Sequence, residues 1–419
     1  MTSNHKLSQT TSSIRLPGLL CLLPAILSAL ATAGEIAVVD GVTHVRNSAS
    51  PPGGVQTVTV KELWRAGGED DEVLFGSIGR VLTDAEGTVY LLDSRLSQVH
   101  VYSPQGDYLR ALSREGDGPG ESRRPNDMFF CADSALGLIQ IFPGKVIKVN
   151  RDGTPAGTMD FSQGDPTQGR FAVLIQGTAR GDVLALLGMR MTFSPDGTQH
   201  QTHFLSRCDD RGVEQHRYLS KESTVSYADF VMSEREQDFV YGRFALGPDG
   251  AMYVAPERNR YAIHVFRPDG TLERIIQRPY ESLKRGDPER VRARQTLDAI
   301  AANYPARPRD TVILDTEQDI TLIHVTSEGE IWVGTSRGDA HPPQGAMMLV
   351  DVFDRQGNFV SQKALMIPGD ARRDAAFFLD GGRVVVVKGA LDAFLEQYGV
   401  APEGGEGSLM EVICYELGE

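Results

Sequence analysis

Short runs of alternating apolar and polar residues, separated by turns rich in Gly and Asp, recur along most of this chain. The clearest copy covers residues 78–113, where the turn Asp84-x-x-Gly87 joins two alternating runs. Two further runs, 99–102 and 108–112, follow and are separated by a turn at Gly106. Alternation with a period of two predicts half-buried β-strands. Four such strands in about 40 residues are typical of one blade of a β-propeller.

The same pattern returns along the chain, and each copy has a glycine in its first turn. These glycines are Gly87, Gly137, Gly181, Gly250, Gly329 and Gly382. The sequence therefore predicts an all-β fold, a six-bladed β-propeller over residues 55–419, preceded by a lead-in at 34–54. The run 55–63 alternates but has no repeat of its own. We expect it to complete the last blade, because pairing the two chain ends removes exposed sheet edges.

One segment, 281–309, predicts a short helical insertion. Asp287 can cap the helix, Pro288 suits its first turn and Glu289 complements its dipole. A partial apolar stripe is formed by Val291, Leu297, Ile300, Ala301 and Tyr304, and a basic group by Arg290, Arg292 and Arg294. Two interpretations stay open: a lid or docking element at one mouth of the propeller, or a solvated helix packed on a blade edge.

The first copy resembles an NHL repeat. The resemblance rests on the 84–87 turn, Val89-Tyr90-Leu91, Asp93-Ser94 and Val99-x-Val101-Tyr102. The segment 116–121, Gly-Asp-Gly-Pro-Gly-Glu, is similar to a loop of an exported bacterial family described only as six-bladed beta-propellers. The resemblance implies the fold more than a function. The Gly250 copy departs from it, since Pro256 stands where Asp93 stands in the first copy.

The first 33 residues predict a signal peptide. Lys6 and Arg15 precede an apolar run at 16–30. An Ala-Thr-Ala motif ends at residue 33, so cleavage before Gly34 is expected. The run is shorter than the roughly 20 apolar residues that span a bilayer. We therefore expect export to the periplasm or the extracellular space without a stable membrane span. A lipoprotein signal at Cys21 is the alternative, although Leu20 stands where such signals place a small residue.

The net charge bears on the class of partner, and the cysteine content bears on disulfide bonds. The formal net charge is −14, and loss of residues 1–33 removes two positive charges and brings it to −16. Such an acidic surface repels phosphate backbones, so nucleic acid is not an expected partner. Three cysteines remain after export, Cys131, Cys208 and Cys414. One disulfide and one free thiol are conceivable, but the sequence leaves the pairing open.

Two loops carry candidate ligand-binding residues. Asp117 and Glu121 lie in the 116–121 loop, which contacts a ligand or serves only as a tight connection between blades. Arg95 follows Asp93-Ser94 and can project into solvent or a groove, whereas Asp93 and Ser94 are expected to hold backbone amides of their turn. On the helical insertion, Arg290 and Arg294 are the candidate ligand-binding residues.

A metal site is the second possibility. His324 is the candidate ligand, whereas His100 and His264 hold matching positions in two repeats, which favours a packing role. Axial calcium sites instead use carboxylate and amide oxygens, for which Asn126, Asp127, Asp249 and Asp319 are eligible. No nucleophile elbow or P-loop is present, and no motif specifies a cofactor.

The sequence thus predicts a binding or scaffold module for a protein or small-molecule partner. The alternative is a metal-dependent hydrolase or lyase whose site lies on the propeller axis. Neither the ligand nor an oligomeric state follows from the residues.

Overall fold

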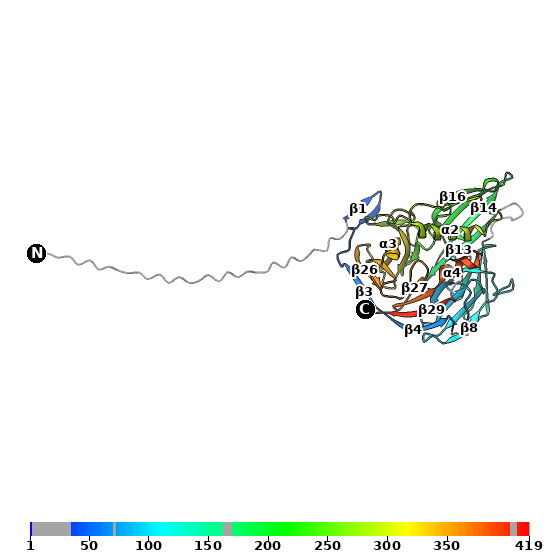
Figure 1. Ribbon diagram of the computed structural model, residues 1–419, viewed down its shortest axis with the longest axis horizontal. Coiled ribbons are helices and arrows are strands. Elements are labelled where there is room, and N and C mark those ends of the chain that lie inside the picture. The colour runs from blue at the N-terminus through cyan, green and yellow to red at the C-terminus, as the bar shows by residue number, and fades with distance from the viewer. Residues whose placement is uncertain (2–34, 70–72, 162–169, 403–408, 419) are drawn as a thin grey trace. The chain divides into compact units, whose positions relative to one another are not determined.

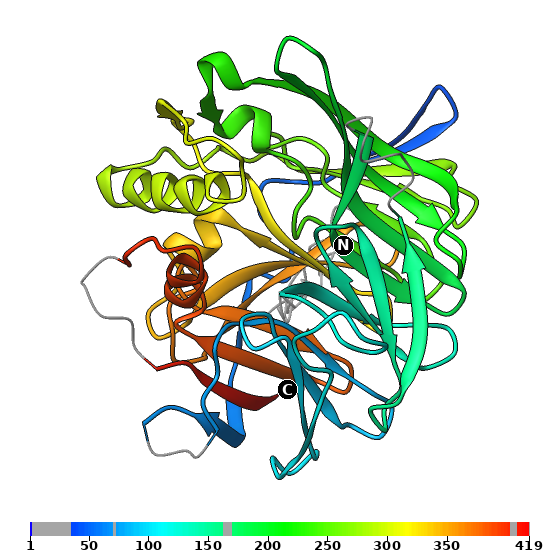
Figure 2. The same ribbon diagram turned by 90° about the vertical axis from the view of Figure 1, so that its right-hand side faces the viewer.

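Short strands and tight turns make almost the whole described chain into antiparallel sheets. The computed structural model describes residues 1, 35–69, 73–161, 170–402 and 409–418. The chain divides into two units, Met1–Thr32 and Ala33–Glu419, and the second holds every strand reported below. Six of its sheets are arranged around a common centre as a six-bladed β-propeller (Figures 1 and 2), which confirms the predicted fold class.

The first three blades follow the chain and have four strands each. Their strands are β5 (Ile78–Thr83), β6 (Val89–Asp93), β7 (Gln98–Tyr102) and β8 (Tyr108–Leu112); β9 (Pro125–Phe130), β10 (Leu136–Gln140), β11 (Lys145–Val149) and β12 (Pro155–Asp160); and β13 (Arg170–Arg180), β14 (Val183–Phe193), β15 (Thr198–Cys208) and β16 (Glu214–Ser226). The strands of the third blade are about twice as long as those of the others.

The last three blades also take up strands from the N-terminal segment. Their own strands are β18 (Phe244–Leu246), β19 (Met252–Val254), β20 (Ala262–Phe266) and β21 (Leu272–Gln277); β23 (Ile320–Val325), β24 (Ile331–Thr335), β25 (Met348–Phe353) and β26 (Phe359–Leu365); and β27 (Ala375–Leu379), β28 (Arg383–Lys388) and β29 (Glu411–Leu417). The added strands are β1 (Glu35–Val39) and β2 (Val42–Arg46) on the fourth blade, β3 (Val55–Val58) on the fifth and β4 (Val60–Gly67) on the sixth.

The N-terminal strands close the ring. β4 pairs antiparallel with β29, with Trp64 opposite Cys414, so the first and last parts of the propeller share one sheet. The prediction that 55–63 completes the last blade is right for β4 and wrong for β3, which runs parallel to β26 on the neighbouring blade. Of the expected lead-in, residues 35–46 form a hairpin that adds to β21. In this way the N-terminal strands cover the outer edges of β21, β26 and β29.

Five of the six predicted turn glycines do adopt positive φ in the first turn of a blade, and one prediction was wrong. Gly137 lies inside β10 and pairs with Phe129. In that blade Ser134 takes the turn position, with φ +66°, and its amide donates to the Cys131 carbonyl at 2.8 Å. Serine tolerates this left-handed conformation less well than glycine, so a single sequence cannot show the substitution by its glycine pattern.

Glycines in the third turn of the blades lie against the preceding blade. A Cβ at Gly106, where φ is +93°, would lie 2.4 Å from the Trp64 Cβ on β4. A Cβ at Gly357, where φ is +90°, would lie 2.5 Å from the Ile276 side chain on the fourth blade. Between the blades, buried Val, Ile, Leu, Phe and Tyr side chains form a series of separate clusters. The ring is therefore held by contacts between adjacent blades.

Beyond the blades, the structure contains a short parallel pair and several helices. They are β17 (Val231–Ser233) and β22 (Asp310–Val312), with η2 (Tyr227–Asp229), α1 (Glu234–Gln237), α2 (Asp287–Ala301), α3 (Ser336–Ala340) and α4 (Ala390–Gln397). α2 is the predicted insertion helix, and Figure 2 shows it beside α4. The Gln295 side chain donates to the carbonyl of Ala401, which follows α4 in the chain, at 3.0 Å. No helix among the described residues is long and apolar enough to cross a membrane.

Details of α2 differ from the sequence-based expectation. Its N-cap is Gly286, one residue before Asp287, and the Gly286 amide donates to Glu289 Oε2 at 3.0 Å. Val291 is exposed, whereas Leu297 and Ala301 pack into a small cluster with Met232. The helix thus packs on β17 and the loops around it, because the third blade's long strands extend beyond the ring and give it a second surface.

The propeller has two faces. In each blade the first strand starts on one face, where the second and third strands are also connected and the fourth strand ends. We name it the top face, and the opposite one the bottom face. The 93–98 and 254–262 loops, the 113–124 connection, α2, α3 and α4 all belong to the top face. His324, near the end of β23, lies toward the bottom face.

Candidate ligand-binding cleft on the top face

A cleft with a volume of about 480 Å³ opens on the top face beside the third and fourth blades. Its lining combines β16, α1 with the residues after it, the β19–β20 loop and Leu314. The lining residues are Leu219, Ser220, Lys221, Arg235, Asp238, Phe239, Val240, Pro256, Glu257, Arg258, Asn259 and Leu314. Ligand sites commonly measure about 300–1,000 Å³ and have apolar walls with a few polar groups. This cleft has that size but a more polar lining, because five of its twelve lining side chains are apolar and seven are polar or charged.

Glu234, at the start of α1, is the centre of an ion-pair network behind the cleft. Its carboxylate accepts from Arg285 Nη1 and Nη2 at 2.6 and 2.8 Å, from Arg258 Nη2 at 2.7 Å and from the Leu314 amide at 2.7 Å. Arg285 also donates to Glu317 at 2.8 Å. Burial opposes ionisation, but the Arg285 and Leu314 hydrogen bonds and the Arg258 charge outweigh it and lower the pKa of Glu234. The network joins α1, the β19–β20 loop and the base of the insertion.

Asp238 extends the network toward the ring. Its carboxylate accepts from Arg258 Nη1 at 3.2 Å and from Arg243 Nη2 at 3.1 Å. Arg243 is fully buried, and its Nε and Nη1 have no hydrogen-bond partner among the described residues. Burial lowers the pKa of Arg243. Because Glu234 and Asp238 are each shared by two arginines, these two carboxylates have little capacity left for a cationic ligand.

Two cationic side chains line the cleft without a carboxylate partner. Lys221 Nζ donates to the backbone carbonyls of Arg235, Glu236 and Asp238 at 2.5, 3.1 and 2.7 Å. These carbonyls satisfy its hydrogens but carry no net charge, and burial lowers the pKa of Lys221. The Arg235 guanidinium is exposed and forms no hydrogen bond or ion pair with the part of the chain that the structure describes. Positive charge in the cleft is therefore only partly neutralised.

The predicted ligand-binding loop holds its own carboxylates. Glu121 accepts from the Gly118 amide at 2.9 Å and from Arg114 Nε at 2.7 Å, and these bonds lower its pKa. Asp117 forms a two-point ion pair with Arg123 at 2.9 and 2.7 Å, which lowers its pKa as well. Both side chains lie on the top face but outside the cleft. A ligand role for them remains a prediction.

Arg95 also lies on the top face, in the β6–β7 loop, and its side chain is exposed. Beside it, Asp93 accepts from the Arg95 and Leu96 amides at 3.1 and 3.0 Å, which confirms the expected structural role of that aspartate.

The pairing of His100 with Leu91 and of His264 with Val254 likewise confirms that the two histidines occupy matching strand positions.

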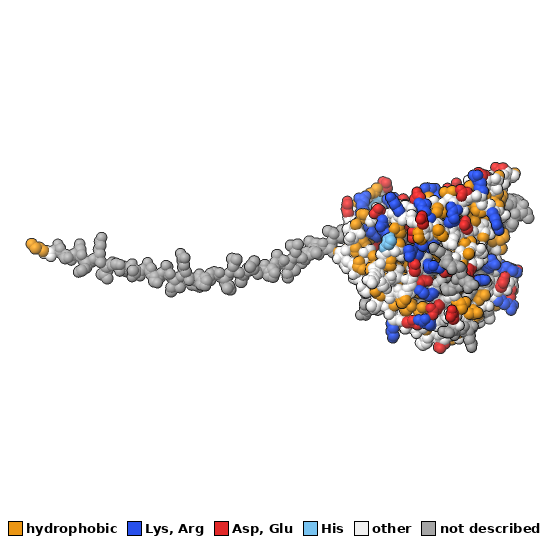
Figure 3. Space-filling view, viewed as in Figure 1, with side chains coloured by type: hydrophobic (Ala, Val, Ile, Leu, Met, Phe, Trp, Pro, Cys, Tyr) orange, Lys and Arg blue, Asp and Glu red, His pale blue; other side chains and the backbone are white. Residues whose placement is uncertain are grey.

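The arginines of α2 are largely engaged within the protein. Arg290 pairs with Asp315 at 2.7 Å, Arg292 with Glu289 at 3.0 Å, and Arg294 donates to the Thr311 carbonyl at 3.1 Å. On the face seen in Figure 3, acidic and basic side chains are interspersed over the propeller surface. Binding of a ligand by Arg290 or Arg294 stays a prediction, and neither lines the cleft.

His324 lies apart from all of these residues. Its ring packs against Phe378 and Trp332, with ring centroids 5.4 and 6.3 Å away. Burial lowers its pKa to about 4, so the ring is neutral at pH 7. Among the described residues, no group of three His, Cys, Asp or Glu side chains could hold a metal ion. A metal at His324 remains a prediction that would need further ligands.

The innermost strands place a paired carboxylate near the axis. Asp127 on β9 accepts from the Gly177 amide at 3.0 Å and lies 3.3 Å from Arg80 Nε on β5. Burial raises its pKa. The Asn126 side chain donates to the Ile175 carbonyl at 2.8 Å, and Asp249 lies in the β18–β19 turn, where it accepts from the Ala251 amide. Asn126, Asp127 and Asp249 are thus engaged separately, whereas Asp319 is buried and its Oδ1 has no hydrogen-bond partner among the described residues.

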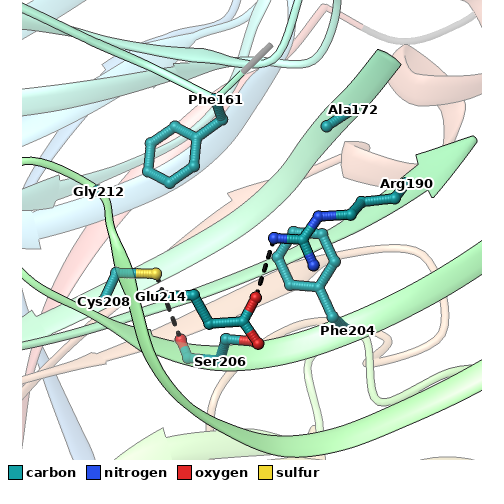
Figure 4. A pocket seen from close by; sticks show the side chains of 8 residues that line it. All are labelled: Phe161, Ala172, Arg190, Phe204, Ser206, Cys208, Gly212 and Glu214. Carbon is teal, nitrogen blue, oxygen red and sulfur yellow. Dashed lines mark hydrogen bonds and ion pairs between the residues drawn. The ribbon is translucent and has the colours of Figure 1, made fainter. Parts of the chain in front are cut away.

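A second, much smaller pocket lies between the second and third blades (Figure 4). Its volume is about 20 Å³, enough for little more than a water molecule. The Arg190 guanidinium lies over the Phe204 ring and pairs with Glu214 at 2.9 Å, and burial raises the pKa of the nearby Cys208 thiol to about 12. Cys131, Cys208 and Cys414 are all free thiols in the structure.

The sequence analysis did not identify the residues of the cleft. Its lining comes from four separate segments of the chain, and Arg258 and Glu234 have no spacing that marks them as partners. One signal was available: Pro256, which departs from the Asp of the first repeat, lines the cleft. A repeat that loses its structural aspartate has a different loop at that place, and this is where the cleft opens.

The family comparison agrees with the fold. The family described as "6-bladed beta-propeller" matches residues 69–162, which is less than half of the chain. No curated protein matches. A protein of Bacteroides fragilis is similar in structure, with 11% identity, a TM-score of 0.45 and coverage of 90% of this chain and 100% of that one.

Two named proteins are similar at the same level. Regucalcin from Agrobacterium tumefaciens, a calcium-binding protein, has 11% identity, a TM-score of 0.43 and coverage of 86% and 95%. A gluconolactonase from Xanthomonas campestris has 12% identity, a TM-score of 0.38 and coverage of 85% and 98%. Likenesses this distant give no information on the ligand or the chemistry of this chain.

Proposed function

We propose that this chain is an exported, non-enzymatic binding module with NHL-like repeats, and that it holds a small-molecule ligand in the top-face cleft. The observation that supports this proposal best is the cleft of about 480 Å³, whose walls are fixed by the Glu234 network. A preorganised wall favours binding because little ordering entropy is lost when the ligand enters. The signal-peptide pattern of residues 1–33 supports export.

The alternative, a metal-dependent hydrolase or lyase with its site on the axis, requires several oxygen or nitrogen ligands that converge there. Asp127 is instead close to Arg80 and the Gly177 amide. An arginine beside the carboxylate disfavours a cation at the same place. We therefore favour binding in the cleft over chemistry on the axis.

The test uses a variant that fills the cleft. Ser220 is exposed on β16 and lines the cleft, whereas Ser226 is exposed at the end of the same strand and does not. Mature wild type, Ser220→Trp and Ser226→Trp proteins are incubated with a small-molecule extract of the producing cells, and retained compounds are measured by mass spectrometry after gel filtration. We expect the same compounds on wild type and Ser226→Trp and their loss from Ser220→Trp.

Two results would contradict the proposal. Equal retention by both variants would place binding outside the cleft. Metal-dependent turnover of a lactone or ester by the wild type would support the axial enzyme. Export is tested with the full chain produced in cells, because the exported protein should begin at Gly34, as read by N-terminal sequencing.

A further inference from the structure

The chemical class of the ligand follows from the groups that line the cleft. Three lining side chains are cationic, Lys221, Arg235 and Arg258, and two are anionic, Asp238 and Glu257. Both carboxylates are already paired: Asp238 with Arg243 and Arg258, and Glu257 with Arg260 at 2.9 Å. The carboxylates of Asp238 and Glu236 act on the charge of Lys221. The charged group of the cleft without a counterion in the described chain is therefore the Arg235 guanidinium.

Hydrogen-bonding capacity points the same way. The Arg235 guanidinium lines the cleft, is exposed and forms no hydrogen bond with the described residues, so its N–H groups are available to a ligand. A guanidinium can only donate, so the groups on the ligand that satisfy these positions must be acceptors. A carboxylate supplies two acceptor oxygens and the missing negative charge at once.

The remaining wall is apolar. Leu219, Phe239, Val240, Pro256 and Leu314 all line the cleft. Phe239 is buried, and its ring lies 5.5 Å from the ring of His203, which holds it in place. Apolar surface next to a cationic rim favours a ligand with a carboxylate at one end and a hydrocarbon part at the other.

We propose that the cleft binds small organic acids, with the carboxylate at Arg235 and an apolar body against the wall around Phe239. This inference rests on the proposed function, since it names the ligand class of the same cleft. It applies to a monocarboxylate attached to a hydrocarbon part, and it excludes primary amines of the same shape. Lys221 donates no hydrogen bond to the anion, because its hydrogens are already donated to three carbonyls.

The experiment compares three probes that share one hydrocarbon chain: hexanoate, 1-hexanol and hexylammonium. Their affinities for the mature protein are measured by ligand-observed NMR at low salt and again at high salt. We expect hexanoate to bind about tenfold more tightly than 1-hexanol, a difference of about 1.4 kcal/mol. Added salt should reduce this preference, because it screens a partly exposed charge pair. Hexylammonium should bind most weakly of the three.

Variants connect the preference to the cleft. Arg235→Ala should remove the preference for hexanoate and leave binding of 1-hexanol unchanged, whereas Arg235→Lys should keep much of it. Arg211→Ala is the matched control, because Arg211 is an exposed arginine in the β15–β16 turn on the bottom face. Ser220→Trp should abolish binding of hexanoate and 1-hexanol alike.

The outcomes separate this inference from the proposed function. The acid assignment would be overturned if all three probes bound equally, or if hexylammonium bound most strongly. If Ser220→Trp abolished that binding, the cleft would still be a binding site. A hexanoate preference that survives Arg235→Ala would also overturn it. If no probe binds, the acid assignment fails, and the retention experiment with Ser220→Trp still decides whether the cleft binds a ligand.

Discussion

Replacement of Glu234 by glutamine should weaken the attachment of α1 and the insertion to the propeller. Glutamine has the same shape but no charge, and its amide nitrogen cannot accept the bonds that one carboxylate oxygen now accepts. Arg258 and Arg285 would each keep one carboxylate, Asp238 and Glu317, and lose the other. Removal of one member of a buried ion pair typically costs about 3–5 kcal/mol. Because both arginines keep a partner, we expect about 3 kcal/mol, at the lower end of that range.

The assay is urea unfolding monitored by fluorescence of Trp64 and Trp332, combined with amide hydrogen exchange. Exchange should accelerate most in α2 and β22 and least in the first blade, because the network holds the base of the insertion. Glu222→Gln on β16 is the control, since Glu222 is exposed. Equal unfolding midpoints for Glu234→Gln and Glu222→Gln would refute the reasoning.

The pH dependence of this difference has a definite sign. The pKa of Glu234 is lowered in the folded protein from its ordinary value of 4.5. Its contribution is therefore present above about pH 4.5 and is lost as the pH falls through the lowered value. The difference between wild type and Glu234→Gln should be constant near neutral pH and should shrink below pH 4.5. A difference that grew on acidification would contradict the ion-pair assignment.

Three further predictions concern other parts of the chain. Gly106→Ala should lower the free energy of unfolding by more than about 2 kcal/mol, because the new Cβ would overlap Trp64 and alanine would be held at a positive φ. Gly41→Ala is the control for the backbone effect, since Gly41 has a positive φ in open space. Similar urea midpoints for the two variants would argue against the overlap. The pKa of His324 is lowered to about 4, so its neutral form stabilises the fold above pH 6.5, and this stability is lost as the pH falls toward 4. His324→Phe should gain about 2–3 kcal/mol relative to wild type over that window, and parallel curves would refute it. Arg235→Ala should leave the urea midpoint unchanged, because its guanidinium is exposed.

The repeat pattern was sufficient to predict the architecture because each blade repeats the same local chemistry. The alternating strands around Gly87 and Gly250 carry their own turns, so their pairing is local in the sequence. The prediction was wrong where a turn uses a different residue, as at Ser134. It was also incomplete where the chain pairs across long separations, as β3 does with β26. A strand of four residues carries no sequence signal for its partner.

The cleft could not be predicted for a related reason. Glu234 and Arg258 meet because the connection between the third and fourth blades packs on the β19–β20 loop, and charged residues in loops carry no periodicity. Candidate residues chosen by local chemistry, such as Asp117 and Glu121, were found in pairs with neighbours in their own loop. Local motifs therefore indicated turn geometry, and the cleft depends on contacts between loops of different blades.

Hydrogen–deuterium exchange of the mature protein, with and without the compounds retained from the cell extract, tests the central claim most directly. The account predicts slower exchange in residues 219–221, 235–240 and 256–259, which line the cleft, and unchanged exchange on the bottom face. Ser220→Trp should show no such slowing, whereas Ser226→Trp should behave as the wild type does. Slower exchange confined to the bottom face or to the innermost strands around Asp127 would contradict a binding site in the top-face cleft.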